Sequence, residues 1–214
     1  MTRAFRFAPF AALALLAGRA MGGPKTEVSI YAPQSRIQAD PAWPAVDWRL
    51  TIGTPDTHAL LDSQRIAVRP TPDRLQTYKG ARWADTAPEM VQLALVEAFE
   101  DSGKITAVSR WGGGRGDMGL YTDLRAFETI YEGGAPKVVV EIQARLVQFR
   151  GNGGVIAARR FRTEVAPAGA DIEPVVAAFG EALAQASTDI VGWTLTEGER
   201  SLSALEEESA GTSD

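Results

Sequence analysis

Residues 61–93, which read LDSQRIAVRPTPDRLQTYKGARWADTAPEMVQL, carry the strongest structural signal in this chain. Apolar and polar residues alternate over 64–69, and a second short run over 75–78 follows a Pro-Thr-Pro-Asp turn. Alternation bounded by proline and aspartate is typical of two short paired strands. The stretch then passes through residues 78–85, which we call the aromatic corner, and enters a helix with proline in its first turn.

Two segments have the spacing of amphipathic helices. The first spans about 87–102, where Pro88 suits the first turn and an apolar stripe should face a sheet. Leu93 and Val96 lie on the opposite, acidic side of this helix. Isolated apolar residues are common at protein surfaces, but a contact with a partner or a second copy is the alternative. The second helix is predicted over about 171–191.

Several other segments have the period of strands. They are residues 26–31, 47–52, 105–109, 120–131, 137–149 and 155–165, with an Asn-Gly type turn at 151–154 between the last two. The inward-facing set changes parity between Leu124 and Phe127, which predicts a bulge. Long strands joined by hairpins, together with two helices, predict an α+β fold. We expect a mixed, largely antiparallel sheet with both amphipathic helices packed on one face.

The two ends of the chain differ from this middle region. Residues 1–23 read as an export signal, with Arg3 and Arg6 before an apolar run and small residues after it. The run is shorter than the roughly 20 apolar residues that a membrane-spanning helix needs. Residues 24–198 are predicted to form one domain. Residues 199–214 are polar and acidic, and we expect a disordered tail there.

Composition narrows the classes of function. The formal net charge of −5 argues against nucleic acid as a partner. The chain has no cysteine, and His58 is its one histidine. It therefore has few of the residues from which enzymes build a nucleophile and its paired base. Asp117, Asp123 and Glu128 lack the spacing of a calcium loop, and the glycine-rich residues 111–116 lack the ending of a P-loop. The sequence therefore predicts no catalytic, cofactor-binding or metal-binding residues. A small hydrolase that uses His58 is the alternative.

The last two strands carry most of a weak basic cluster, made of Arg145, Arg150, Arg159, Arg160 and Arg162. Cross-strand pairing with Glu141 and Glu164 explains most of these charges. A surface that docks an acidic partner is the second interpretation.

The aromatic corner is the best candidate for a functional site. Tyr78 and Trp83 are large rings of the kind that anchor protein interfaces, Arg82 lies between them, and Gly80 allows a backbone shape that a side chain would prevent. The candidate partner-binding residues are Tyr78, Gly80, Arg82, Trp83, Leu93 and Val96. In the alternative interpretation, Trp83 fills the core beneath the first helix and Arg82 pairs with Asp85.

The order of a strand, the Tyr-x-Gly-x-x-Trp pattern at 78–83 and a helix begun by proline resembles the auxiliary lipoprotein family of ABC-type transporters. That family includes the periplasmic partner of the paraquat-inducible lipid-transport system. The resemblance covers roughly residues 48–193 and implies the same two helices on a sheet. It further implies a non-enzymatic periplasmic subunit of an intermembrane transport system for lipids or organic solvents, which docks on a mammalian-cell-entry type component.

The resemblance leaves several alternatives open. One is a periplasmic lipid-binding protein that holds an apolar ligand between helices and sheet. Another is assembly into a homo-oligomer. A member of this family would carry its lipid on a cysteine at the end of the signal, but Arg19 occupies that position. The sequence as written therefore predicts no lipidation and a released periplasmic protein, with outer-membrane association only where a lipidated form exists.

Overall fold

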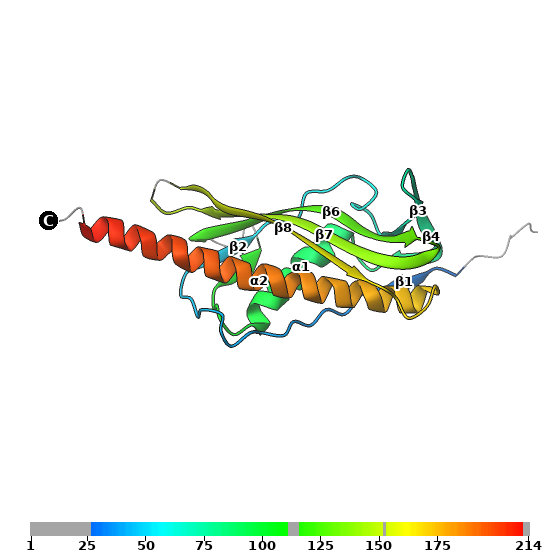
Figure 1. Ribbon diagram of the computed structural model, residues 1–214, viewed down its shortest axis with the longest axis horizontal. Helices are drawn as coiled ribbons and strands as arrows, with labels where there is room; N and C mark the ends of the chain where they lie inside the picture. Colours follow the sequence, from blue (N-terminus) through cyan, green and yellow to red (C-terminus); the bar gives the residue numbers. More distant parts are fainter. Residues whose placement is uncertain (1–26, 111–115, 152, 212–214) are drawn as a thin grey trace, which may run out of the picture.

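The computed structural model describes residues 27–110, 116–151 and 153–211, with two helices and an eight-stranded sheet (Figure 1). The strands are β1 (Ser29–Tyr31), β2 (Leu50–Ile52), β3 (Arg65–Thr71), β4 (Arg74–Trp83), β5 (Val108–Arg110), β6 (Met118–Glu132), β7 (Ala135–Gln148) and β8 (Gly154–Val165), and the helices are α1 (Ala87–Asp101) and α2 (Ile172–Gly211). The expected export signal and most of the glycine-rich loop, residues 111–115, lie outside the described residues.

The long strand β6 organises the sheet. Its first half pairs in parallel with β2, and β5 pairs with the outer side of β2. Its second half pairs in parallel with β3, followed outward by β4 and β1. Along its other edge, β6 pairs antiparallel with β7 over its whole length, and β8 pairs antiparallel with β7. The predicted α+β fold with a mixed sheet is confirmed.

The predicted bulge is also confirmed. The register between β6 and β7 shifts between Leu124 and Ala126. Leu124 is buried before the shift and Phe127 is buried after it, although an odd number of positions separates them. Because side chains alternate between the faces of a strand, one extra residue is needed to keep both apolar sets on the same face.

The core lies between α2 and the sheet. Helix α2 runs lengthwise along the sheet and packs against β7 and β8 (Figure 1). Three fully buried aromatic rings meet there: Trp83 from β4, Phe127 from β6 and Phe179 from α2. Their centroids lie 4.7 to 5.7 Å apart, within the range that edge-to-face and tilted ring pairs prefer.

Residues 32–45, which we call the strap, lead from β1 towards β2 and run along the outer side of the helices (Figure 1). A Cβ atom at Gly180 would lie 2.4 Å from the carbonyl oxygen of Gln34, and one at Gly192 would lie 2.6 Å from Nε1 of Trp43. Glycine at these positions therefore lets the strap approach the backbone of α2. The molecule has three layers, formed by sheet, helices and strap.

Helix α2 is longer than predicted. It continues to Gly211, so the expected disordered tail from residue 199 is corrected as far as residue 211, and residues 212–214 lie outside the described part. Alanine, leucine and glutamate favour helix in this stretch, and Leu202 packs against the core. The Ser201 hydroxyl also donates to Oε1 of Gln148, 2.9 Å away. Over the described residues, neither helix has the length and apolar character needed to cross a bilayer.

Candidate functional site

Trp83 belongs to the core and not to the surface. Its side chain has no exposed area, and its ring packs edge-on against Phe127 and Phe179. A ring in this position cannot contact a partner unless the fold opens. The interpretation of Trp83 as an interface anchor is therefore corrected, and its alternative as a packing residue describes the structure.

Residues 78–83 of the aromatic corner form the end of strand β4. Gly80 has a φ of +75°, and the pairing of β3 with β4 is irregular in this region, between Arg65 and Ala67. This backbone conformation confirms the need for glycine at position 80. Nη1 of Arg82 donates to Oε1 of Gln64 at 3.1 Å, so the expected pair of Arg82 with Asp85 is not what holds this side chain.

Tyr78 is half-buried and packs against the core, where burial raises the pKa of its hydroxyl. Of the four candidate residues in the aromatic corner, only Arg82 has an exposed side chain. This part of β4 therefore supports the core and offers little surface to a partner.

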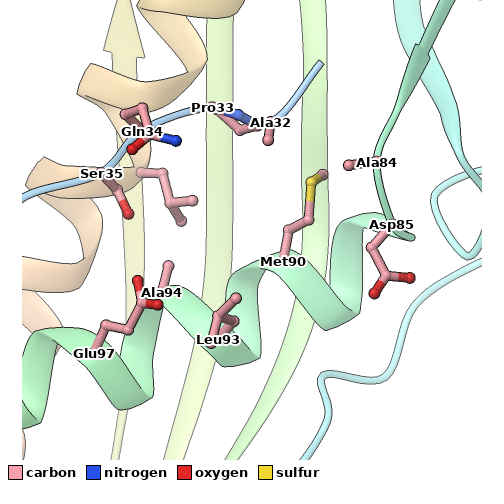
Figure 2. A pocket seen from close by; sticks show the side chains of 11 residues that line it. Ala32, Pro33, Gln34, Ser35, Ala84, Asp85, Met90, Leu93, Ala94 and Glu97 are labelled. Carbon is pink, nitrogen blue, oxygen red and sulfur yellow. The ribbon is translucent and has the colours of Figure 1, made fainter. Parts of the chain in front are cut away.

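Where β4 ends and α1 begins, the chain forms an open groove with a volume of about 400 Å³ (Figure 2). We call it the α1–strap groove. Helix α1 contributes Met90, Leu93, Ala94 and Glu97, the strap contributes residues 32–35, and Ala84, Asp85 and Leu183 complete the lining. Leu93 is 42% exposed, which makes it an apolar side chain open to contact. Val96 is not part of the lining and packs against the core.

The charges of the α1–strap groove have one sign. Among the described residues, its lining holds two carboxylates, Asp85 and Glu97, and no lysine, arginine or histidine. Figure 2 shows these carboxylates on either side of Leu93, with Asp85 just before α1 and Glu97 further along the helix. Oδ1 of Asp85 accepts a hydrogen bond from the backbone N–H of Thr86 at 2.8 Å, which fixes the position of that carboxylate. The groove combines an apolar floor with an acidic rim.

Sequence reasoning found only part of this groove. It singled out Leu93, because an apolar residue on an acidic helix face is visible in the sequence. It missed the strap, which reaches the site only because Gly180 permits its approach to α2. A glycine inside a strongly periodic helix is a signal of such close packing, but it does not identify the packed segment.

The residues considered for catalysis are not assembled into a site. His58 is exposed, and the nearby Ser63 hydroxyl donates to the carbonyl oxygen of Leu60 at 2.6 Å instead of pairing with the imidazole. The three carboxylates considered for metal binding all form ion pairs: Asp117 with Arg49 and Arg150, Asp123 with Arg145, and Glu128 with Arg69. The described residues contain no cluster of three or more potential metal ligands.

Asp117 has the most perturbed surroundings of these groups. Burial by itself would raise the pKa of its carboxyl. Hydrogen bonds from the side chain and backbone of Arg49 and from Arg150 outweigh burial and lower this pKa below its ordinary value. The network joins the start of β6 to the residues before β2 and after β7, which is a structural role.

On the outer face of β7 and β8, the predicted cross-strand pairing is confirmed. Glu141 accepts ion pairs from Arg160 and Arg162, and Glu164 pairs with Arg162 and Lys137. The basic cluster is thus largely neutralised on this face. Arg159 points to the other side of β8, where its guanidinium lies 5.1 Å from the centroid of the Phe161 ring.

Comparisons with known proteins agree with this architecture. The family described as the ABC-type transport auxiliary lipoprotein component matches residues 29–191. An uncharacterized protein of Bradyrhizobium diazoefficiens is 31% identical over 180 residues, which cover 81% of this chain but only 47% of that relative. The chain therefore spans about half the length of the relative.

Two solved structures share the fold. A Xanthomonas campestris protein assigned to family DUF330 is 42% identical with a TM-score of 0.79, over 82% of this chain and 99% of that one. A second, uncharacterized protein has a TM-score of 0.61 at 17% identity, over 77% of this chain and 97% of that one. The second likeness concerns the fold alone.

Proposed function

Because the chain belongs to the family of ABC-type transport auxiliary lipoprotein components, we propose that it is an exported, non-enzymatic accessory subunit of an ABC-type transport system. Its cargo would be lipids or organic solvents, and its role would be to dock on a mammalian-cell-entry type component in the periplasm. Docking would take place at the α1–strap groove. Family membership supports the association with a transporter, and the groove supports the mode of contact.

The observation that carries this proposal is the exposed apolar side chain of Leu93 in a groove of about 400 Å³. An apolar anchor that enters a concave site is the usual centre of a protein interface. The acidic rim formed by Asp85 and Glu97 adds a charge preference. A matching partner segment would project one apolar side chain, with lysine or arginine on both sides of it.

The alternative, an apolar ligand held between helices and sheet, has less support. The aromatic cluster of Trp83, Phe127 and Phe179 fills the centre of that interface. A ligand site of ordinary size needs several hundred cubic ångström. Native mass spectrometry of the purified chain would separate the two functions, because a lipid retained at one per chain supports the alternative.

Co-purification with the mammalian-cell-entry type protein tests the proposal. Leu93→Gln should weaken capture of that protein several-fold, since fully burying a leucine is worth roughly 1.5–3 kcal/mol and Leu93 is 42% exposed in the free chain. Val155→Gln is the matched control, because Val155 is also an exposed apolar residue, 60% exposed, but lies on β8 away from the groove. Equal capture by both variants and the unmodified chain would overturn docking at this groove.

The acidic rim gives a second, independent measurement. Glu97→Gln should slow association and reduce its dependence on salt, because rim charges act mainly on the rate of encounter. Surface plasmon resonance at two salt concentrations measures both effects. An unchanged association rate at low salt would contradict a basic partner segment.

A further inference from the structure

A second pocket, of about 550 Å³, opens where the strap crosses α2 beside β8. It combines side chains from three elements, which include Asp40 and Trp43 from the strap, Asp189 and Trp193 from α2, and Arg159 from β8. A third carboxylate in the lining, Glu197 of α2, forms an ion pair with Arg200. We call it the Trp43–Arg159 pocket. None of its lining residues belongs to the α1–strap groove.

The pocket contains a basic residue, Arg159, whose position is set by an aromatic contact. The guanidinium of Arg159 stacks over Phe161, whose ring packs edge-on against Trp193 with centroids 5.6 Å apart. Neighbouring Arg160 and Arg162 pair with Glu141, whereas Arg159 forms no ion pair with the described residues. A guanidinium suits phosphate oxygens, because it can donate two hydrogen bonds in one plane.

The same pocket contains carboxylates and indole rings. Asp189 precedes Trp193 by one turn of α2, and it forms no ion pair with the described residues. Trp43 comes close to α2 at Gly192, which has no side chain to prevent it. On the strap, Oδ1 of Asp40 is fixed by the backbone N–H of Ala42 at 2.8 Å. An ammonium group gains from both surroundings, through charge attraction and through the face of an indole.

The presence of both charges in one pocket disfavours a simple ion as the ligand. A free anion would be drawn to Arg159 but repelled by Asp40 and Asp189, and a free cation would meet the reverse problem. A ligand that carries both charges on one short frame satisfies all three residues. We propose that the Trp43–Arg159 pocket binds a phosphodiester linked to an amine, with the phosphate on Arg159 and the ammonium between the indoles and the carboxylates.

A phosphodiester linked to an amine could come from two sources, namely a soluble headgroup and the headgroup of a phospholipid. Glycerophosphoethanolamine is the soluble probe, and calorimetric titration of the full chain measures its binding. Vesicles of phosphatidylglycerol with and without phosphatidylethanolamine form the second arm. Binding to the soluble probe alone assigns a free metabolite, and additional retention on the vesicles with phosphatidylethanolamine assigns a lipid headgroup.

Variants test the residues. Arg159→Gln and Asp189→Asn should each weaken binding of glycerophosphoethanolamine at least tenfold, whereas Arg160→Gln should leave it unchanged. Arg160 is the matched control, since it is the next residue of β8 but faces Glu141 on the outer side. Arg159 and Asp189 are exposed, so thermal unfolding of these variants should match that of the unmodified chain.

Three results would overturn the proposal. The first is that neither glycerophosphoethanolamine nor the vesicles with phosphatidylethanolamine bind. The second is equal binding of glycerophosphoglycerol, which lacks the amine, and the third is an equal loss for Arg160→Gln and Arg159→Gln. Leu93→Gln should leave binding of the probe unchanged, so failure of this proposal and failure of the docking proposal remain distinguishable.

Discussion

The outer face of the sheet and the strap side of the helices use charge in opposite ways. On the outer face, Glu141 and Glu164 are each matched by arginine or lysine across neighbouring strands. On the strap side, Asp85 and Glu97 share a groove with an exposed leucine, and the described residues place no basic side chain in its lining. The carboxylates of the outer face are therefore paired within the chain, whereas those of the groove have no basic partner in its described lining. This difference is why we assign partner contacts to the strap side.

The largest effect should come from the core that holds these two surfaces in place. Trp83→Ala removes a fully buried ring from the aromatic cluster and should cost about 3–5 kcal/mol of unfolding free energy. Urea unfolding followed by circular dichroism measures it, with Trp83→Phe as a control that should lose less. A folded variant that loses only partner capture would instead make Trp83 a contact residue. The partner would then bind at Trp83, and the contrast between the outer face and the strap side would not explain where it docks.

A second change affects the strap alone. Gly180→Ala places a methyl group against the carbonyl oxygen of Gln34, so we expect a loss of about 1–3 kcal/mol. The sign is informative, because alanine would otherwise stabilise a helix by about 1 kcal/mol relative to glycine. Glu181→Ala, on the exposed side of the same turn, is the control. Stabilisation by both substitutions would mean that the strap does not pack on α2.

The third prediction concerns Asp117, the buried carboxylate between Arg49 and Arg150. Asp117→Asn should cost about 1–3 kcal/mol at neutral pH, because charge-assisted hydrogen bonds are lost. The pKa of Asp117 is lower in the folded chain than the value near 3.8 in the unfolded chain. The contribution of Asp117 to the free energy of unfolding is therefore complete above pH 3.8 and is lost as the pH falls through the pKa of the folded chain.

Urea unfolding at pH 7 and at pH 3 measures this dependence. The difference in stability between the unmodified chain and the Asp117→Asn variant should shrink at the lower pH. A difference that stays constant between the two pH values would contradict the assigned role of the charge.

The smallest effect should appear on the outer face. Arg162→Gln removes ion pairs with Glu141 and Glu164, but both partners keep another cation, and exposed pairs are worth about 0–1 kcal/mol. Partner capture should stay unchanged in this variant. Loss of capture, with the fold intact, would move the docking surface to the sheet.

Sequence patterns predicted the features that depend on neighbouring residues. The start and end of α1, the strands of the β7–β8 hairpin and the bulge near Leu124 all follow from local periodicity. Features that depend on distant contacts were predicted less well. The burial of Trp83 was one of two interpretations, because it depends on Phe179, almost one hundred residues later in the chain. The position of the strap was missed, since it depends on Gly180 and Gly192 of α2.

The end of α2 was also predicted wrongly, because its order depends on contacts with distant residues. The acidic composition after residue 199 indicated a disordered tail, but Leu202 and Ser201 find partners on the core and on β7. The candidate site was likewise predicted only in part. Leu93 was recognised from its own helix, whereas residues 32–35 on the opposite wall carried no local signal.

Hydrogen exchange with and without the mammalian-cell-entry type partner tests the central claim most directly. Binding should slow exchange in residues 32–35 and 90–97, which line the α1–strap groove, and leave residues 154–165 of β8 unchanged. Protection confined to β7 and β8, with unchanged exchange along α1, would show that the partner binds the outer face of the sheet and would contradict this account.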